Sequence, residues 1–211
     1  MDKNKLQLPH ETGLATQTTV NQYGEKNIHI DEVANLHQNV IMVPMFQRPS
    51  AGGRPTQQAL RTDYYHLFVM GGETFETDHF IVPPDRALMK YWTNDELRDK
   101  YGPLSVEAIE ELKMFPALFM PEPDMYYAKA GEDQAAYFGF VTDIRVQDNG
   151  IKIRYNPMLA IPLQAVCNIG FELGMKDMTR ALTELNKTHW ALKRINLVEE
   201  LKDAKLFFPG F

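Results

Sequence analysis

The residues that could bind a metal or act in acid–base catalysis are the histidines and the carboxylates near them. The six histidines are His10, His29, His37, His66, His79 and His189. None lies in an HExxH pattern, and a single cysteine cannot form a CxxC pair. Asp78, His79 and Asp85 flank one expected strand, and His66 lies on another. If these strands were neighbours, the four groups could form the metal or general-base site of a metal-dependent hydrolase. Otherwise they are polar residues at strand ends and on the surface.

A second set of candidate residues lies on an expected β-hairpin over residues 134–155. Asn149-Gly150 at its centre tolerates the positive φ angles of a two-residue turn. With these two residues as the loop, Arg145 faces Arg154 and Lys152 lies nearby, opposite the apolar face. Like charges that face each other across two strands repel. Two interpretations of these three hairpin cations stay open. Either nearby aspartates and solvent neutralise them, or they bind an anionic partner such as phosphate or an acidic protein surface.

A third candidate is the segment 186–194, NKTHWALKR, which combines an aromatic residue, a histidine and three cations. Trp190 could stack on a base while Lys193 contacts a phosphate. Together with the hairpin cations, these two residues would form a binding site for a nucleotide or a single-stranded nucleic acid. In the alternative interpretation, Trp190 packs in the core, Thr188 caps a short helix, and the cations stay in solvent.

Two further patterns do not indicate catalysis. The run GGETFETD, which begins at Gly71, lacks the lysine and hydroxyl of a P-loop and is expected to form a turn. Cys167 lies in an apolar helical segment, where a thiol is usually a small buried side chain. We therefore expect no catalytic residue and no cofactor.

The elements that must position these residues predict an α+β fold around a mainly antiparallel sheet. Residues 64–70, 79–83 and 117–120 read as buried strands, and the hairpin is the centre of the sheet. Thr93 and Glu96 form a capping-box pattern for a short helix that ends near Gly102. Ser105 opens a second helix, which stops at Phe115-Pro116.

Helices are also expected in the C-terminal part of the chain. Pro162 suits a first helical turn, and Gly174 suits the position just past a helix end. Apolar residues recur at helical spacing over 175–185, and a final helix begins at Asn196 with Glu199 as its capping partner.

The first fifty residues are expected to be an appendage with its own role. Residues 1–19 carry few large apolar groups, and residues 20–43 suggest short strands joined by tight turns. A thin hairpin is marginal by itself, so we expect residues 18–43 to self-associate or to bind a protein partner through exposed strand edges. The proline- and glycine-rich run 44–56 marks a linker. The predicted division is an appendage over residues 1–50 and an α+β body over residues 57–211.

Composition places limits on the class of protein. At 211 residues with 44% hydrophobic residues, the chain can bury a core. Its net charge of −6 argues against a dedicated duplex-DNA binder, whose phosphate contacts require a basic surface. The single cysteine fits a reducing compartment, the N-terminus is no secretory signal, and no apolar run reaches the ~18 residues of a membrane span. We expect a cytoplasmic protein that does not bind membranes.

Several segments resemble an uncharacterised bacterial family. These are VNQYGEKNIHIDEVANLHQNV, LFVMGGETF, DHFIVPPDRAL and ELNKTHWALKRINLVEEL. The first is similar to an N-Q-x-G…I-x-I segment that is common near the N-terminus of conflict, phage-defence and mobile-element proteins. The resemblance implies an accessory or assembly component of such a system and no assigned chemistry. The expected function is therefore binding without catalysis. A nucleotide- or single-strand-binding module and a metal-dependent hydrolase are the alternatives.

Overall fold

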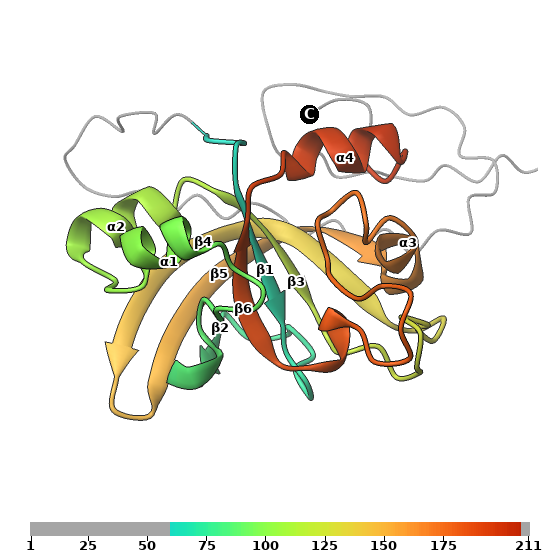
Figure 1. The fold of residues 1–211 in the computed structure, drawn as a ribbon, viewed down its shortest axis with the longest axis horizontal. Coiled ribbons are helices and arrows are strands. Elements are labelled where there is room, and N and C mark those ends of the chain that lie inside the picture. The colour runs from blue at the N-terminus through green and yellow to red at the C-terminus, as the bar shows by residue number, and fades with distance from the viewer. Residues whose placement is uncertain (1–59, 208–211) are drawn as a thin grey trace, which may run out of the picture. The chain divides into compact units, whose positions relative to one another are not determined.

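The computed structural model describes residues 60–207, in which six strands form a single sheet (Figure 1). The strands are β1 (Tyr65–Val69), β2 (His79–Val82), β3 (Pro116–Met120), β4 (Ala135–Gln147), β5 (Gly150–Pro162) and β6 (His189–Lys193). Their order across the sheet is β2-β5-β4-β3-β1-β6. Only the β1–β3 pair among these strands is parallel, so the predicted α+β fold with a mainly antiparallel sheet is confirmed.

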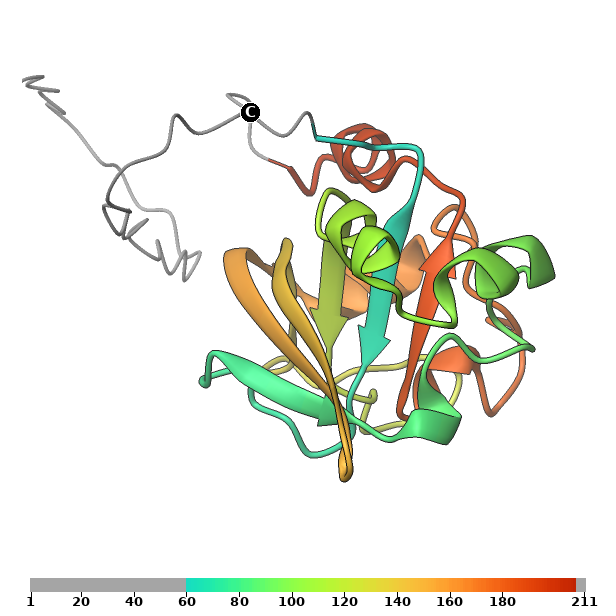
Figure 2. The same cartoon turned by 90° about the vertical axis from the view of Figure 1, so that its left-hand side faces the viewer.

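The sheet is strongly curled. The long hairpin formed by β4 and β5 bends over one face and carries β2 along its outer edge (Figure 2). Although three strands separate β2 from β1, the rings of Phe68 on β1 and Phe80 on β2 lie 5.2 Å apart. Two bulges, at Thr142 on β4 and Met158 on β5, interrupt the hairpin ladder, as expected where a sheet bends.

The hairpin is present, but its predicted register is wrong by two residues. The loop is Asp148-Asn149, and Gly150 belongs to β5 with a φ of 138°. Arg145 therefore faces Lys152 rather than Arg154. Side chains alternate with period two along a strand, so this shift leaves the assignment of the two faces unchanged. The glycine sits where a Cβ atom would come within 2.8 Å of a β2 carbonyl, which favours this register.

Four short α-helices cover the two faces of the sheet in the described part of the chain. They are α1 (Asp95–Tyr101), α2 (Val106–Leu112), α3 (Leu163–Asn168) and α4 (Leu197–Asp203), and two 3-10 turns, η1 (Pro84–Arg86) and η2 (Glu184–Asn186), accompany them. The predicted caps Ser105 and Asn196 are confirmed, because each side chain accepts a backbone N–H in the first turn of its helix. For α1 the cap is Asn94 rather than the predicted Thr93.

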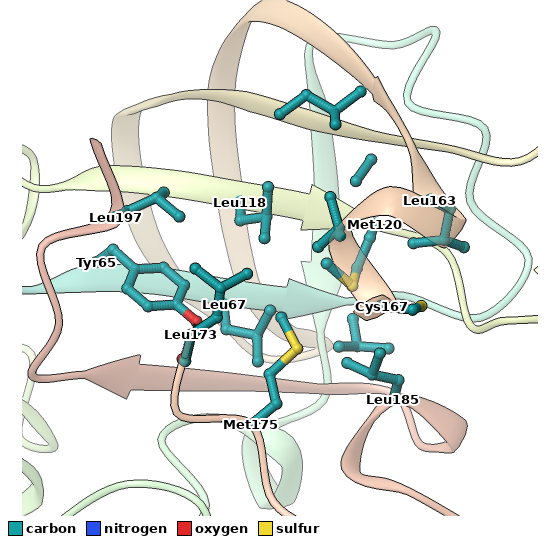
Figure 3. Packing of buried hydrophobic residues seen from close by; sticks show 14 of the residues in the cluster. Tyr65, Leu67, Leu118, Met120, Leu163, Cys167, Leu173, Met175, Leu185 and Leu197 are labelled. Atoms are coloured by element: carbon teal, nitrogen blue, oxygen red, sulfur yellow. The ribbon is translucent and has the colours of Figure 1, made fainter. Parts of the chain in front are cut away.

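Each face of the sheet has its own hydrophobic core. One core joins Tyr65, Leu67 and Leu118 of the sheet to apolar residues of α3, α4 and the segment 173–185 (Figure 3). The other core lies inside the curl, where Phe68, Phe119 and neighbouring aromatic rings pack against residues of α1 and α2. The sheet is thus buried on both sides along β1, β3 and β6, whose residues are all buried.

Two C-terminal predictions are wrong. The helix expected over 161–174 is shorter than predicted and consists of α3 alone. The apolar residues of 175–185 lie in turns and in η2 rather than in an α-helix. Residues 189–193 form β6 instead of a short helix capped by Thr188. Pairing with β1 at the edge of the sheet explains this outcome, because alternate residues of β6 enter the two cores.

The predicted appendage over residues 1–50 and the linker over 44–56 lie outside the described residues. Among the helices of residues 60–207, none has the length and apolar character needed to cross a bilayer.

Candidate anion-binding site

The three hairpin cations lie together on the outer, polar face of β4 and β5, and two of them have acidic partners. Arg145 donates to Asp143 over 2.6 Å, and Arg154 forms an ion pair with Asp78 at the start of β2. Lys152 lies opposite Arg145. The hydrogen bond from His79 and the charges of Arg154 and Lys152 lower the pKa of Asp78, so Lys152 also lies near a carboxylate and the neutralising interpretation describes all three cations.

The side chain of Trp190 is not accessible to a ligand. Its side chain is fully buried in the inner core, stacked against Phe68, and its indole N–H donates to Nδ1 of His66 over 3.0 Å. The prediction that Trp190 stacks on a base is wrong, and the core interpretation of this residue is correct. His66 is also fully buried, and burial lowers its pKa to about 4, although the carbonyl of Leu112 opposes this shift.

The residues of the hydrolase hypothesis do not come together. Asp78 and His79 form an exposed pair at the start of β2, where Oδ1 and Nδ1 lie 2.7 Å apart. His66 lies on β1, which is not a neighbour of β2, and Asp85 pairs with Arg86 in η1. Within residues 60–207, no three His, Cys, Asp or Glu side chains are placed to share a metal ion.

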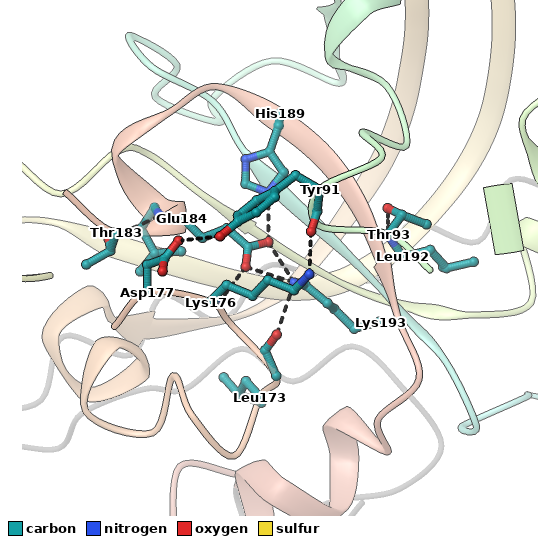
Figure 4. Close-up of polar contacts among 12 residues, drawn as sticks. Tyr91, Thr93, Leu173, Lys176, Asp177, Thr183, Glu184, His189, Leu192 and Lys193 are labelled. Atoms are coloured by element: carbon teal, nitrogen blue, oxygen red, sulfur yellow. Dashed lines mark hydrogen bonds and ion pairs between the residues drawn. The ribbon is translucent and has the colours of Figure 1, made fainter. Parts of the chain in front are cut away.

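The remaining predicted site residue, Lys193, belongs to a buried ionic cluster. Its ammonium lies 2.7 Å from Oε1 and 2.8 Å from Oε2 of Glu184, and it donates to the carbonyl of Gly174 over 3.1 Å (Figure 4). His189 lies 3.1 Å from the same Glu184 carboxylate. The backbone N–H of Lys176 donates to Glu184 over 2.7 Å. The side chains of Glu184, His189 and Lys193 are at most 6% exposed.

The electrostatics of this cluster are those of a carboxylate held in its charged form. Burial raises the pKa of Glu184, but hydrogen bonds and charge attraction from His189 and Lys193 outweigh burial and leave that pKa lowered. Burial also lowers the pKa of Lys193, and Glu184 opposes this effect. The cluster therefore holds an ionised carboxylate against two basic side chains in a region without solvent.

Above this cluster lies a cleft of about 440 Å³. Its lining residues come from the segment 90–94 and the start of α1, from Gly174 and Lys176, and from the end of β6. Four cations line the cleft, namely Lys90, Lys176, Lys193 and Arg194, and Asp95 is its one carboxylate among the described residues. No protein-family model, curated protein or solved structure matches this chain. What the cleft can bind follows from its own side chains.

The four cations of the cleft differ in how far they are already neutralised. Lys193 is paired with Glu184, and Arg194 donates to Glu96 over 2.8 Å. Lys90 and Lys176 have no carboxylate partner in the described part of the chain; the Lys176 ammonium instead donates to the carbonyl of Tyr91. Since Asp95 is itself paired with Arg98, the cleft presents an excess of positive charge.

Of the cleft residues, only Lys193 was among the predicted site residues. Lys90 and Lys176 carry no motif, and they lie in segments that meet Lys193 only in the fold. The detectable signal was the presence of several basic residues around 187–194 in a chain of net charge −6.

Proposed function

We propose that this protein acts through binding and that the cleft above Glu184 holds a small anionic ligand. The observation that carries the proposal is the charge of the cleft. Lys90 and Lys176, which pair with no carboxylate of residues 60–207, and the buried Lys193 lie together in a chain whose net charge is −6. Such a local concentration of one sign attracts a ligand of the opposite sign.

The size and polarity of the cleft favour a small molecule with a phosphate or carboxylate group. A volume of about 440 Å³ falls within the range of small-molecule sites. Thr93, which accepts the Leu192 N–H over 3.2 Å, offers a hydroxyl donor beside the lysines. A mononucleotide is one ligand of this kind, and we propose this form of the nucleotide-binding alternative without a role for Trp190.

The wider role is proposed from the resemblance of its sequence segments. We propose a cytoplasmic, non-catalytic component of a bacterial defence or mobile-element system that contacts a protein partner or another copy through residues 18–43. Deleting residues 1–50 should then change the mass in solution measured by light scattering. An unchanged oligomeric state with unchanged partner binding would contradict this role.

Isothermal titration with anions tests the cleft. The ligands are inorganic phosphate, pyrophosphate, AMP, ATP, citrate and a short DNA single strand. The test variant is Lys90→Gln/Lys176→Gln. The control is Arg145→Gln/Lys152→Gln, which removes the same charge from the hairpin face. Because a hydrogen bond to a charged group contributes about 1.5–3 kcal/mol, the cleft variant should lose at least tenfold in affinity. Binding should also weaken with salt. Equal affinity of both variants, or loss only in the control, would contradict the proposal.

A further inference from the structure

The ring of His189 faces hydrogen-bond acceptors at both nitrogens. Nδ1 lies 2.7 Å from the backbone carbonyl oxygen of Lys187, which can only accept. Nε2 lies 3.1 Å from Oε1 of Glu184. A neutral imidazole has one N–H and can satisfy only one of these two contacts. Both are satisfied if His189 is an imidazolium, or if Glu184 is protonated.

Glu184 has no room for a proton, because donors surround its oxygens. Lys193 approaches both oxygens, at 2.7 and 2.8 Å, and the Lys176 backbone N–H donates to Oε2 over 2.7 Å. These contacts require an ionised carboxylate. Therefore His189 supplies the donor at both of its nitrogens and carries a positive charge.

The buried cluster then contains one carboxylate and two cations, with a net charge of +1. Among residues 60–207, the other groups that interact with it do not cancel this charge. Tyr65 of β1 stays a neutral phenol that donates to the carbonyl of Leu173, and burial raises its pKa further. Lys176 and Lys187 add positive charge. The Nζ atom of Lys187 lies 5.7 Å from the centroid of the Trp92 ring. A buried excess charge is unfavourable without a partner, and the cleft, which Lys193 lines, offers space for one beside the cluster.

We propose that the anion in the cleft is the counter-ion of the His189–Lys193 pair, and that its binding is coupled to the proton on His189. This inference rests on the proposed function and adds the regulation of the same site. Trp92 connects the cleft with His189, because it lines the cleft and its ring centroid lies 4.1 Å from that of His189. Loss of the proton would remove the excess charge and weaken the hold on the ligand.

Thermodynamic linkage gives the size and sign of the effect. A bound anion makes protonation of His189 more favourable, and protonation strengthens anion binding by the same factor. Because one proton is coupled to one anion, Kd should rise by up to tenfold per pH unit as pH increases. Arg194 stays charged over this range, because its hydrogen bond with Glu96 raises its already high pKa.

Sulfate is the suitable probe, because its own charge is constant between pH 5.5 and 8.5, unlike that of phosphate. The full-length protein is titrated with sulfate across this range as wild type, as His189→Gln and as His79→Gln. His79 is an exposed histidine on β2 and serves as the matched control. We expect at least a tenfold weakening with rising pH in the wild type and in His79→Gln, and a flat profile in His189→Gln.

A second measurement does not depend on ligand binding or on the folding of a variant. Ring ¹⁵N shifts of the histidines in the wild type report the protonation of each nitrogen. We expect one buried histidine with both ring nitrogens protonated at neutral pH. A single neutral tautomer for His189, or a sulfate affinity that is constant with pH, would overturn the inference. If no anion binds while His189 is doubly protonated, the proposed function fails and the imidazolium assignment stands.

Discussion

Replacing Glu184 with glutamine tests the buried cluster most severely. The amide keeps the shape of the side chain and can still accept the Lys176 N–H, but it removes the negative charge. Lys193 and His189 then remain in a region without solvent and without a counter-charge.

The magnitude follows from the burial of the cluster. Removing one partner of a buried ion pair costs about 3–5 kcal/mol, because the other charge is left uncompensated. The matched control is Glu96→Gln, which breaks an exposed ion pair of 2.8 Å with Arg194. An exposed pair contributes at most about 1 kcal/mol, so the two variants should differ by several kcal/mol in the free energy of unfolding.

Urea unfolding at neutral pH measures both variants. The double variant Glu184→Gln/Lys193→Met should recover much of the lost stability, because it removes the orphaned ammonium as well. The pKa of Glu184 is lowered, so its contribution is present above the unfolded carboxyl pKa and is lost as pH falls through the folded pKa. A Glu184→Gln variant as stable as Glu96→Gln would refute the account of this cluster.

Three other variants give further predictions. Gly150→Ala places a Cβ atom 2.6 Å from a β2 side chain at a φ of 138°. The control Gly72→Ala also lies at a positive φ, but its Cβ atom would meet open space. In thermal unfolding, Gly150→Ala should therefore lose roughly 1–3 kcal/mol more stability than Gly72→Ala. His66, whose pKa falls to about 4 on burial, stays neutral in the folded protein while the unfolded chain takes up a proton below about pH 6.5. The free energy of unfolding should therefore decrease by about 3 kcal/mol as pH falls from about 6.5 to about 4. In denaturant titrations, the His66→Gln variant should show a weaker dependence of stability on pH. Arg154→Thr breaks an exposed pair with Asp78 and should change stability by no more than about 1 kcal/mol, with anion binding unchanged in calorimetry.

Much of the fold could be predicted because local signals agree with tertiary packing. The strands β1, β2 and β3 are short apolar runs bounded by glycine or proline, and the caps Ser105 and Asn196 each carry a specific side-chain bond. The hairpin register was missed because Asn149-Gly150 suits a two-residue turn locally. The position of Gly150 is instead set by its contact with β2, which is distant in the sequence.

The candidate site could not be predicted, for a different reason. The cleft residues come from three segments, and Glu184, which organises the cluster beneath them, lies in the run 175–185 that was predicted as a helix. Burial of a charged residue depends on partners that only the fold brings near. Trp190 illustrates the converse, because its cationic neighbours suggested a ligand surface while its own side chain lies in the core.

The central claim is that the cleft binds an anion, and a crystal soaked in tungstate tests it most directly, because tungsten gives an anomalous signal that locates the ion. We predict a peak in the cleft within hydrogen-bond distance of the ammonium groups of Lys176 and Lys193. A peak at Arg145 and Lys152 on the hairpin face, with none in the cleft, would contradict the account.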